Sequence, residues 1–111
     1  MPLSCQTERR TLTARVSGEI DHHAARQLMR ELDQMIESRA PLTLVLDLES
    51  VTFMDSSGIA VLLRTRKRML EGGGSIEVRN VPAQAGKVLR AANLQRIVPI
   101  SFGETGEGGY L

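Results

Sequence analysis

An aspartate, two serines and a glycine form the group that could carry chemistry in this chain, in the stretch VTFMDSSGIAVLLRTRKR. Asp55-Ser56-Ser57-Gly58 stands between an apolar run and a segment with helical periodicity. These residue types cap helix starts, where their side-chain oxygens accept backbone N–H groups, so ordinary capping is one interpretation. A modification site is another, because a phosphate on a first-turn serine meets free N–H groups and the positive end of the helix dipole. Such a phosphate adds about 1.5–2 negative charges.

Other chemistries fit these residues poorly. A serine nucleophile of the elbow type needs a glycine two residues before it, whereas Met54 and Asp55 precede the two serines. The only histidines, His22 and His23, are consecutive, so on a helix they point apart, and no third His accompanies them as a metal ligand. The triplet Gly72–Gly74 lacks the Lys-Ser/Thr of a phosphate loop. We therefore expect no catalytic residue, no metal and no cofactor.

Composition narrows the class of protein. The 111 residues suit one compact domain, and 41% hydrophobic with 24% charged residues is ordinary for a globular chain. A net charge of +1 and three aromatic residues argue against binding to nucleic acid. No apolar run is long enough for a membrane span, and the first residues do not resemble a signal peptide. With Cys5 as the only cysteine, a reducing cytoplasmic location is expected.

Hydrophobic periodicity predicts three helices and five strands. The first helix begins after the N-cap Asp21 and extends to about Ser38, the second runs from Ser57 to about Glu71, and Pro82 opens the third. The run LTLVLDL, apolar on nearly both faces, is typical of a central strand covered from two sides. The other strands are predicted at Leu3–Thr7, Thr11–Ser17, Ser75–Arg79 and Ile97–Ile100.

The element order is β-β-α-β-α-β-α-β, which predicts an α/β fold with a mixed, mostly parallel β-sheet and packed α-helices. One antiparallel pair at the start and right-handed crossovers afterwards are expected. We assign residues 1–111 to a single domain with a core over about 3–100, and we expect 101–111, rich in glycine, to be a loosely ordered tail. In such sheets functional groups gather beyond the carboxyl ends of the strands, here the junctions GEIDHH and FMDSSG.

Successive residues of an α-helix are 100° apart around its axis, so the positions of the second helix can be assigned to faces relative to Ser57. Ile59, Leu62, Leu63, Met69 and Leu70 fall opposite Ser57 and are predicted to face the core. Val61 and Arg64 share the face of Ser57, so Val61 is predicted to be an exposed apolar residue one turn from the serine.

Two segments resemble the STAS domain of bacterial anti-sigma factor antagonists: GEIDHHAA and, about thirty residues later, LVLDLESVTFMDSSGIAVLL. The motifs DHH and FMDSSG are most similar to those of the sporulation members. The resemblance covers about Leu12 to Ile100. It implies a small cytoplasmic switch protein that is not an enzyme. Family members often end with a further helix, whereas this chain ends with the short, glycine-rich GETGEGGYL, so the sequence leaves open whether a C-terminal helix forms.

In this family the unmodified protein binds an anti-sigma factor, itself a serine kinase of the GHKL ATPase type, and so frees a sigma factor. The resemblance implies that this kinase phosphorylates the second serine, Ser57, and that a PP2C-type phosphatase removes the phosphate. Alternatives are a STAS subunit of a general-stress or stressosome-like pathway, or a nucleotide-binding STAS protein. The predicted partner surface, from the resemblance and the helix faces together, comprises Glu19, Ile20, Asp21, His22, Asp55, Ser56, Ser57, Val61 and Arg64.

Overall fold

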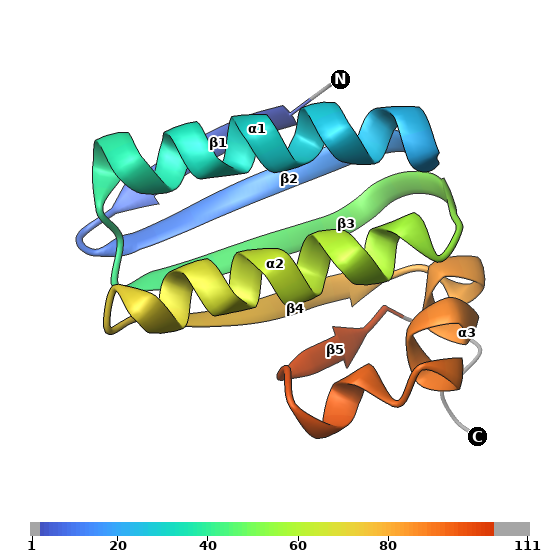
Figure 1. The fold of residues 1–111 in the computed structure, drawn as a ribbon. Helices are drawn as coiled ribbons and strands as arrows, with labels where there is room; N and C mark the ends of the chain where they lie inside the picture. Colours follow the sequence, from blue (N-terminus) through green and yellow to red (C-terminus); the bar gives the residue numbers. More distant parts are fainter. Residues whose placement is uncertain (1–2, 104–111) are drawn as a thin grey trace.

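The computed structural model describes residues 3–103, which form one sheet with its helices (Figure 1). The chain alternates strands and helices after an initial hairpin, as predicted. The elements are β1 (Leu3–Glu8), β2 (Thr11–Ile20), α1 (His22–Arg39), β3 (Thr43–Met54), α2 (Ser57–Glu71), β4 (Ser75–Val81), α3 (Ala83–Ala91), the short 3-10 helix η1 (Leu94–Arg96) and β5 (Ile100–Phe102).

The strands lie side by side in the order β1-β2-β3-β4-β5. β1 and β2 are antiparallel, and every later pair is parallel, which confirms the mixed, mostly parallel sheet. All parallel strands therefore end at the same edge of the sheet, and α1 and α2 begin at that edge.

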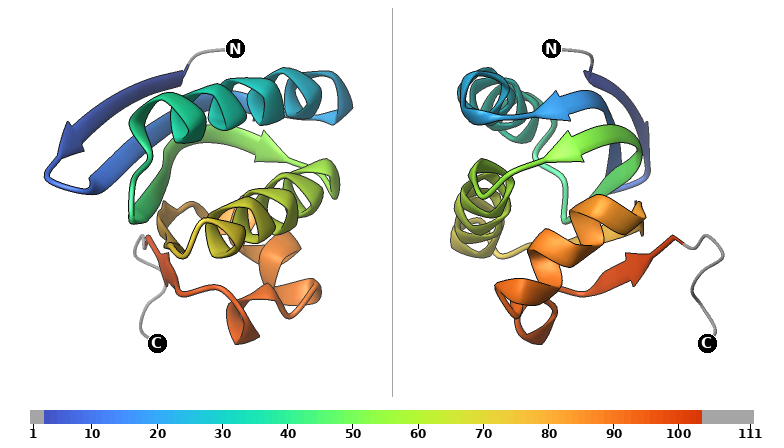
Figure 2. Two further views of the ribbon diagram at one scale, coloured as in Figure 1. Left: turned by 60° about the vertical axis from the view of Figure 1, so that its left-hand side comes forward. Right: turned by 90° about the vertical axis from the view of Figure 1, so that its right-hand side faces the viewer.

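Helices α1 and α2 pack side by side on one face of the sheet (Figures 1 and 2). The core between helices and sheet is rich in leucine and includes Leu28 and Leu32 from α1 and Leu44 and Leu46 from β3. No helix within residues 3–103 has the length and apolar character that crossing a membrane requires.

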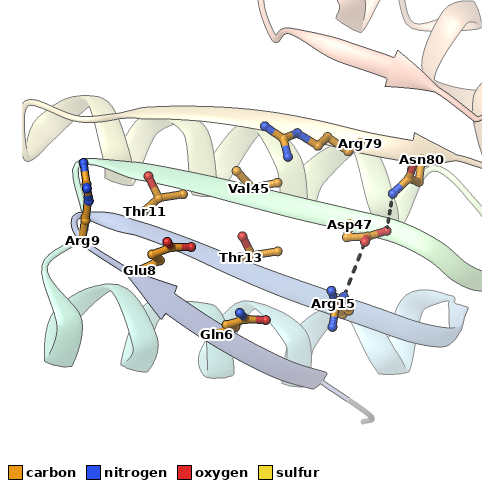
Figure 3. Close-up of a pocket in the computed structure, with 10 residues that line it drawn as sticks. All are labelled: Gln6, Glu8, Arg9, Thr11, Thr13, Arg15, Val45, Asp47, Arg79 and Asn80. Atoms are coloured by element: carbon orange, nitrogen blue, oxygen red, sulfur yellow. Dashed lines mark hydrogen bonds and ion pairs between the residues drawn. The ribbon is translucent and has the colours of Figure 1, made fainter.

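The prediction that β3 is covered from two sides is wrong. Polar side chains such as Thr13, Arg15 and Asp47 lie on the face away from α1 and α2, and no helix covers the part of this face that Figure 3 draws. Val45 lies on this face as well and is still buried. Asp47 keeps β3 polar on this face, and Val45 is the exception that makes the run look apolar on both faces.

Several element ends differ from the predicted ones. β2 does not stop at Gly18 but continues to Ile20, because register irregularities beside Arg15 and Gly18 let the strand bend and go on pairing. The predicted last strand at Ile97–Ile100 lies instead at Ile100–Phe102. Ser101 and Phe102 thus belong to a strand and Gly103 follows it, while residues 104–111 of the predicted tail are outside the described residues.

Helix α2 has the predicted bounds but presents a different face to the core. Its buried residues are Gly58, Val61, Leu62, Thr65 and Met69. Leu63 and Leu70, predicted to be core residues, are 41% and 50% exposed. The helix is therefore turned by roughly one residue position relative to the prediction.

Candidate functional site

The ends of β2 and β3 bring the two predicted junctions together. Ile20 and Met54 are register partners, and the backbone N–H of Asp55 donates to the carbonyl oxygen of Ile20 at 3.2 Å. Asp21 and Asp55 therefore follow directly on neighbouring strands, each just before a helix. This confirms that the two helix starts adjoin on one edge of the sheet.

Asp21 caps α1, as predicted. Its Oδ1 accepts the backbone N–H of Ala24 at 2.9 Å, and its own backbone is extended, as expected of an N-cap residue. The Ala24 N–H, assisted by the nearby His23, lowers the pKa of the Asp21 carboxyl below its ordinary value. Asp21 is therefore a fixed negative charge at this edge at neutral pH.

At the start of α2 the capping group is Asp55, not a serine. Asp55 Oδ1 accepts the backbone N–H of Ser57 at 2.8 Å, while Ser56, the residue before the helix, makes no capping bond with its side chain. Within residues 3–103 neither serine hydroxyl takes part in a hydrogen bond. Ser56 is exposed and Ser57 is half-buried. Both hydroxyls are therefore free for other chemistry.

The N–H groups of this first turn are already engaged, contrary to the expectation that a phosphate would meet free ones. Besides the Ser57 N–H, that of Gly58 donates to the carbonyl oxygen of Asp55 at 3.0 Å, and that of Ile59 to Ser56 at 3.1 Å. A phosphate on Ser57 would compete with the Asp55 carboxylate for its donor. It would also add its charge beside that carboxylate.

Two residues of the predicted partner surface are buried. Val61 is 2% exposed, because α2 turns it onto the sheet with Leu62 and Thr65. Ile20 is also buried, since the last residue of β2 directs its side chain into the core. The prediction that Val61 is an exposed apolar residue is wrong, and neither side chain is available to a partner.

The exposed apolar surface of α2 lies on another side of the helix, which the sequence interpretation missed. Leu63 and the half-buried Ile59 border a hollow of about 430 Å³ together with Leu94 of η1 and Ile97, which follows η1. The spacing of Ile59, Leu63 and Leu70 at intervals of four and seven was visible in the sequence. The sequence assigns this stripe to the core, because nothing local distinguishes two apolar stripes on one helix.

Arg64 is exposed, as predicted, and is held by α1. Its guanidinium donates to Asp33 Oδ2 at 2.8 Å, and Arg68 lies 3.2 Å from the other oxygen of the same carboxylate. The Asp33 carboxylate raises the pKa of Arg64 above its ordinary value. Arg64 is seven residues from Ser57, about 10 Å along the helix axis, so it lies beyond the direct reach of a phosphate there.

The negative side chains at this edge are partly gathered in a shallow hollow of about 330 Å³ at the start of α1. It is lined by Glu19, Asp21 and His23, with Ser17, Gly18, Ala24 and Gln27. Glu19 and His22 are exposed. Together with Asp55, Ser56 and Ser57, they form a surface that we call the switch edge: Glu19, Asp21, His22, Asp55, Ser56 and Ser57.

A larger hollow, of about 550 Å³, lies away from the switch edge on the open face of the sheet (Figure 3). Its charged groups are largely paired: Arg15 lies 3.6 Å from Asp47, which also accepts from Asn80 at 3.1 Å. It contains none of the predicted site residues. Among residues 3–103, no three His, Cys, Asp or Glu side chains are grouped so as to hold a metal ion.

Comparison with known proteins identifies the family. The STAS domain family model matches residues 3–105. The anti-sigma F factor antagonist of Paenibacillus polymyxa is 33% identical over 100 residues, which are 90% of this chain and 86% of the relative. The anti-sigma-B factor antagonist of Bacillus subtilis is 32% identical over 94 residues, or 85% of this chain and 83% of the relative.

Solved structures agree with these relatives. The anti-sigma factor antagonist SpoIIAA in its unphosphorylated form superposes with a TM-score of 0.76 at 26% identity, covering 96% of this chain and 90% of that one. The phosphorylated form of the Bacillus cell fate determinant SpoIIAA superposes with a TM-score of 0.69 at the same identity, covering 96% and 94%. The fold, the two adjoining junctions and these matches together show that the chain belongs to the STAS domain family and is similar to its anti-sigma factor antagonists.

Proposed function

We propose that this protein is an anti-sigma factor antagonist. Its unphosphorylated form binds an anti-sigma factor that is also a serine kinase of the GHKL type, and this binding releases a sigma factor in the cytoplasm. The proposal is supported by the similarity to relatives with that name over 90% of the chain. The observation that carries it is the hydroxyl of Ser57, which takes part in no hydrogen bond within residues 3–103 and lies at the start of α2, where the Asp55 carboxylate accepts the backbone N–H of Ser57.

In this proposal Ser57 is the phosphate acceptor and the protein is a substrate of the kinase, not an enzyme. A phosphate adds about 1.5–2 negative charges, and it does so at an edge that already holds Asp21 and Asp55. The first basic side chain along α2 is Arg64, whose guanidinium is paired with Asp33. The added charge therefore remains largely uncompensated, and the bulk of the phosphate and the cost of desolvating it exclude a partner that closes over the unmodified hydroxyl. A PP2C-type phosphatase restores the binding form.

The proposed partner surface is the switch edge, with Arg64 as its continuation along α2. Ile20 contributes through its backbone, since its carbonyl oxygen holds the N–H of Asp55. Val61 is removed from this surface because it is buried.

A second pathway is compatible with the same mechanism. The similarity to an anti-sigma-B factor antagonist, at 32% identity, is close to that with the anti-sigma F factor antagonist. We therefore keep a role in a general-stress pathway beside a role in sporulation.

The test is incubation with radiolabelled ATP, with and without the anti-sigma factor kinase of the same organism. We expect labelling only in the presence of the kinase. Ser57→Ala should stay unlabelled and still bind the kinase, whereas Ser56→Ala keeps the acceptor hydroxyl of Ser57 and should still be labelled. The Ser57→Asp variant should fold with a change of less than about 1 kcal/mol, because a carboxylate is tolerated at a helix start, and should bind weakly. ATP hydrolysis by the protein alone would overturn the proposal.

A further inference from the structure

The end of β3 reaches beyond its neighbour on one side. β3 pairs with β4 only as far as Asp47 and Arg79, whereas its pairing with β2 continues to Ile20 and Met54. The backbone groups of Met54 that point away from β2 thus lie where β4 no longer supplies a ladder partner. Unpaired backbone groups at such a position cost free energy unless something else bonds them.

Gln84 of α3 supplies both missing bonds. Its Oε1 accepts the backbone N–H of Met54 at 2.8 Å, and its Nε2 donates to the carbonyl oxygen of Met54 at 2.8 Å. A side-chain amide offers the same donor and acceptor as a peptide group. Gln84 therefore takes the place of a strand residue at the end of β3.

Met54 connects this bond to the acceptor serine. The residue that follows it is Asp55, whose carboxylate holds the N–H of Ser57. The side chain of Met54 is buried against Gly58, so closely that a Cβ atom on Gly58 would lie 2.5 Å from Met54 Cγ. Asp55 is thus bonded to Met54 in the chain and Gly58 packs against its side chain, while Gln84 of α3 holds the Met54 backbone.

We propose that Gln84 is a positioning residue that holds the segment Asp55–Gly58 and so fixes the place of the Ser57 hydroxyl for phosphoryl transfer. The consequence for phosphorylation rests on the proposed function, whereas the positioning of the segment does not. Gln84 is itself exposed and lies on another helix, so it acts on Ser57 only through the backbone of Met54.

The experiment compares Gln84→Ala and Gln84→Glu with the wild type. Gln34→Ala is the matched control, since Gln34 is an exposed glutamine on α1 away from this edge. Amide hydrogen exchange, expressed as protection relative to the intrinsic rate at each pH, is measured for Met54 and Ser57. Steady-state phosphorylation by the anti-sigma factor kinase gives kcat and KM for the same proteins.

Gln84→Ala should lower the protection of both amides by about tenfold, which corresponds to about 1.4 kcal/mol. It should lower kcat for phosphorylation by about the same factor, because misplacing a reacting group slows the chemical step. KM should stay close to that of the wild type, whereas the thermal midpoint should fall by several degrees at most, as the loss of these two bonds implies. Gln34→Ala should change none of these quantities.

Gln84→Glu separates positioning from a general loss of structure. At neutral pH one carboxylate oxygen can still accept the N–H of Met54, but the other oxygen faces the carbonyl oxygen of Met54 without a proton and is repelled by it. This repulsion moves the carboxylate away, so protection of the Met54 amide should fall. Below the ordinary Glu pKa of about 4.3 the carboxyl gains a proton that it can donate, and protection should return towards the wild-type value. Unchanged protection in Gln84→Ala, or an equal loss in Gln34→Ala, would overturn the positioning role.

The two proposals fail in different ways. If the wild type takes no phosphate on Ser57, the proposed function is wrong, and the protection data still decide whether Gln84 holds the segment. If the wild type is phosphorylated and Gln84→Ala is phosphorylated at the same kcat, the positioning of Ser57 by Gln84 is wrong while the switch stands.

Discussion

Replacing Val61 by aspartate tests which face of α2 packs on the sheet. The structure buries Val61, whereas the sequence predicts that it is exposed. In the structure Val61 is 2% exposed and belongs to the core, whereas Leu63, two residues on, is 41% exposed. Val61→Asp introduces a carboxylate at a buried position of α2, and Leu63→Asp introduces the same group at an exposed position of that helix.

The expected magnitudes follow from burial. Removing the two methyl groups of Val61 costs about 1.6 kcal/mol of transfer free energy, and about 2–3 kcal/mol with the cavity. A carboxylate without a partner adds several kcal/mol, so Val61→Asp should lose about 4–6 kcal/mol of a total stability that is typically about 5–15 kcal/mol. Leu63→Asp loses only the contribution of its buried part, about 1–2 kcal/mol.

Urea unfolding followed by the helical circular dichroism signal measures both variants. With a slope of about 2 kcal/mol per M, the midpoint should fall by about 2–3 M for Val61→Asp and by about 1 M or less for Leu63→Asp. If Val61→Asp unfolds like the wild type and only binds the anti-sigma factor more weakly, α2 presents Val61 to solvent and the core assignment is refuted.

Three further substitutions test local geometry. Ala40→Gly should raise the unfolding free energy by about 0.5–1 kcal/mol, because Ala40 has a φ of 45° and the left-handed cost of about 1–2 kcal/mol exceeds the entropy that glycine adds to the unfolded chain; thermal unfolding measures the gain, and a loss would contradict the backbone geometry. Gly58→Ala should lower the unfolding free energy by about 1–2 kcal/mol, since the contact with Met54 Cγ outweighs the roughly 1 kcal/mol by which alanine favours a helix, and an increase in stability would show that Met54 moves aside freely. For Asp21 the folded pKa is lowered, so its charge stabilises the fold above the unfolded value near 3.8, and this contribution is lost as the pH falls through the lower folded pKa. Asp21→Asn keeps a side-chain oxygen that can accept the Ala24 N–H but removes the charge. The variant should therefore be less stable than the wild type at neutral pH, where Asp21 is ionised, and equally stable in strong acid, where Asp21 is protonated. Thermal midpoints that differ equally at both pH values would refute a role of the charge.

Much of the fold could be predicted from local sequence signals. The bounds of α1 and its cap at Asp21 follow from an amphipathic pattern behind a good capping residue, and the alternation of strands with helices defines the parallel sheet. The adjoining of the two junctions follows from the same topology, because parallel strands that are neighbours end at one edge.

The rotation of α2 could not be predicted, since the core contact uses Gly58 and Thr65 while Leu63 and Leu70 stay outside. Hydropathy ranks those four residues in the opposite order. A small residue near the helix start lets α2 approach Met54 closely, and this depends on tertiary packing that no local pattern records.

The hydrogen bonds between Gln84 and Met54 could not be predicted from the sequence for a related reason. It joins residues thirty positions apart and replaces a strand partner with a side chain. An exposed glutamine in the first turn of a helix carries no signal of that role. The bend of β2 beyond Gly18 is similar, because a glycine stops many strands but here lies at an irregularity within one.

The central claim, that Ser57 is the switch, is tested most directly by mapping the phosphate after incubation with ATP and the anti-sigma factor kinase, and by measuring the affinity of the modified protein for that kinase. The account predicts a single phosphate on Ser57 and binding weakened by about a hundredfold, as loss of a few kcal/mol at the interface implies. A phosphate on Ser56, or undiminished binding by the protein phosphorylated on Ser57, would contradict it.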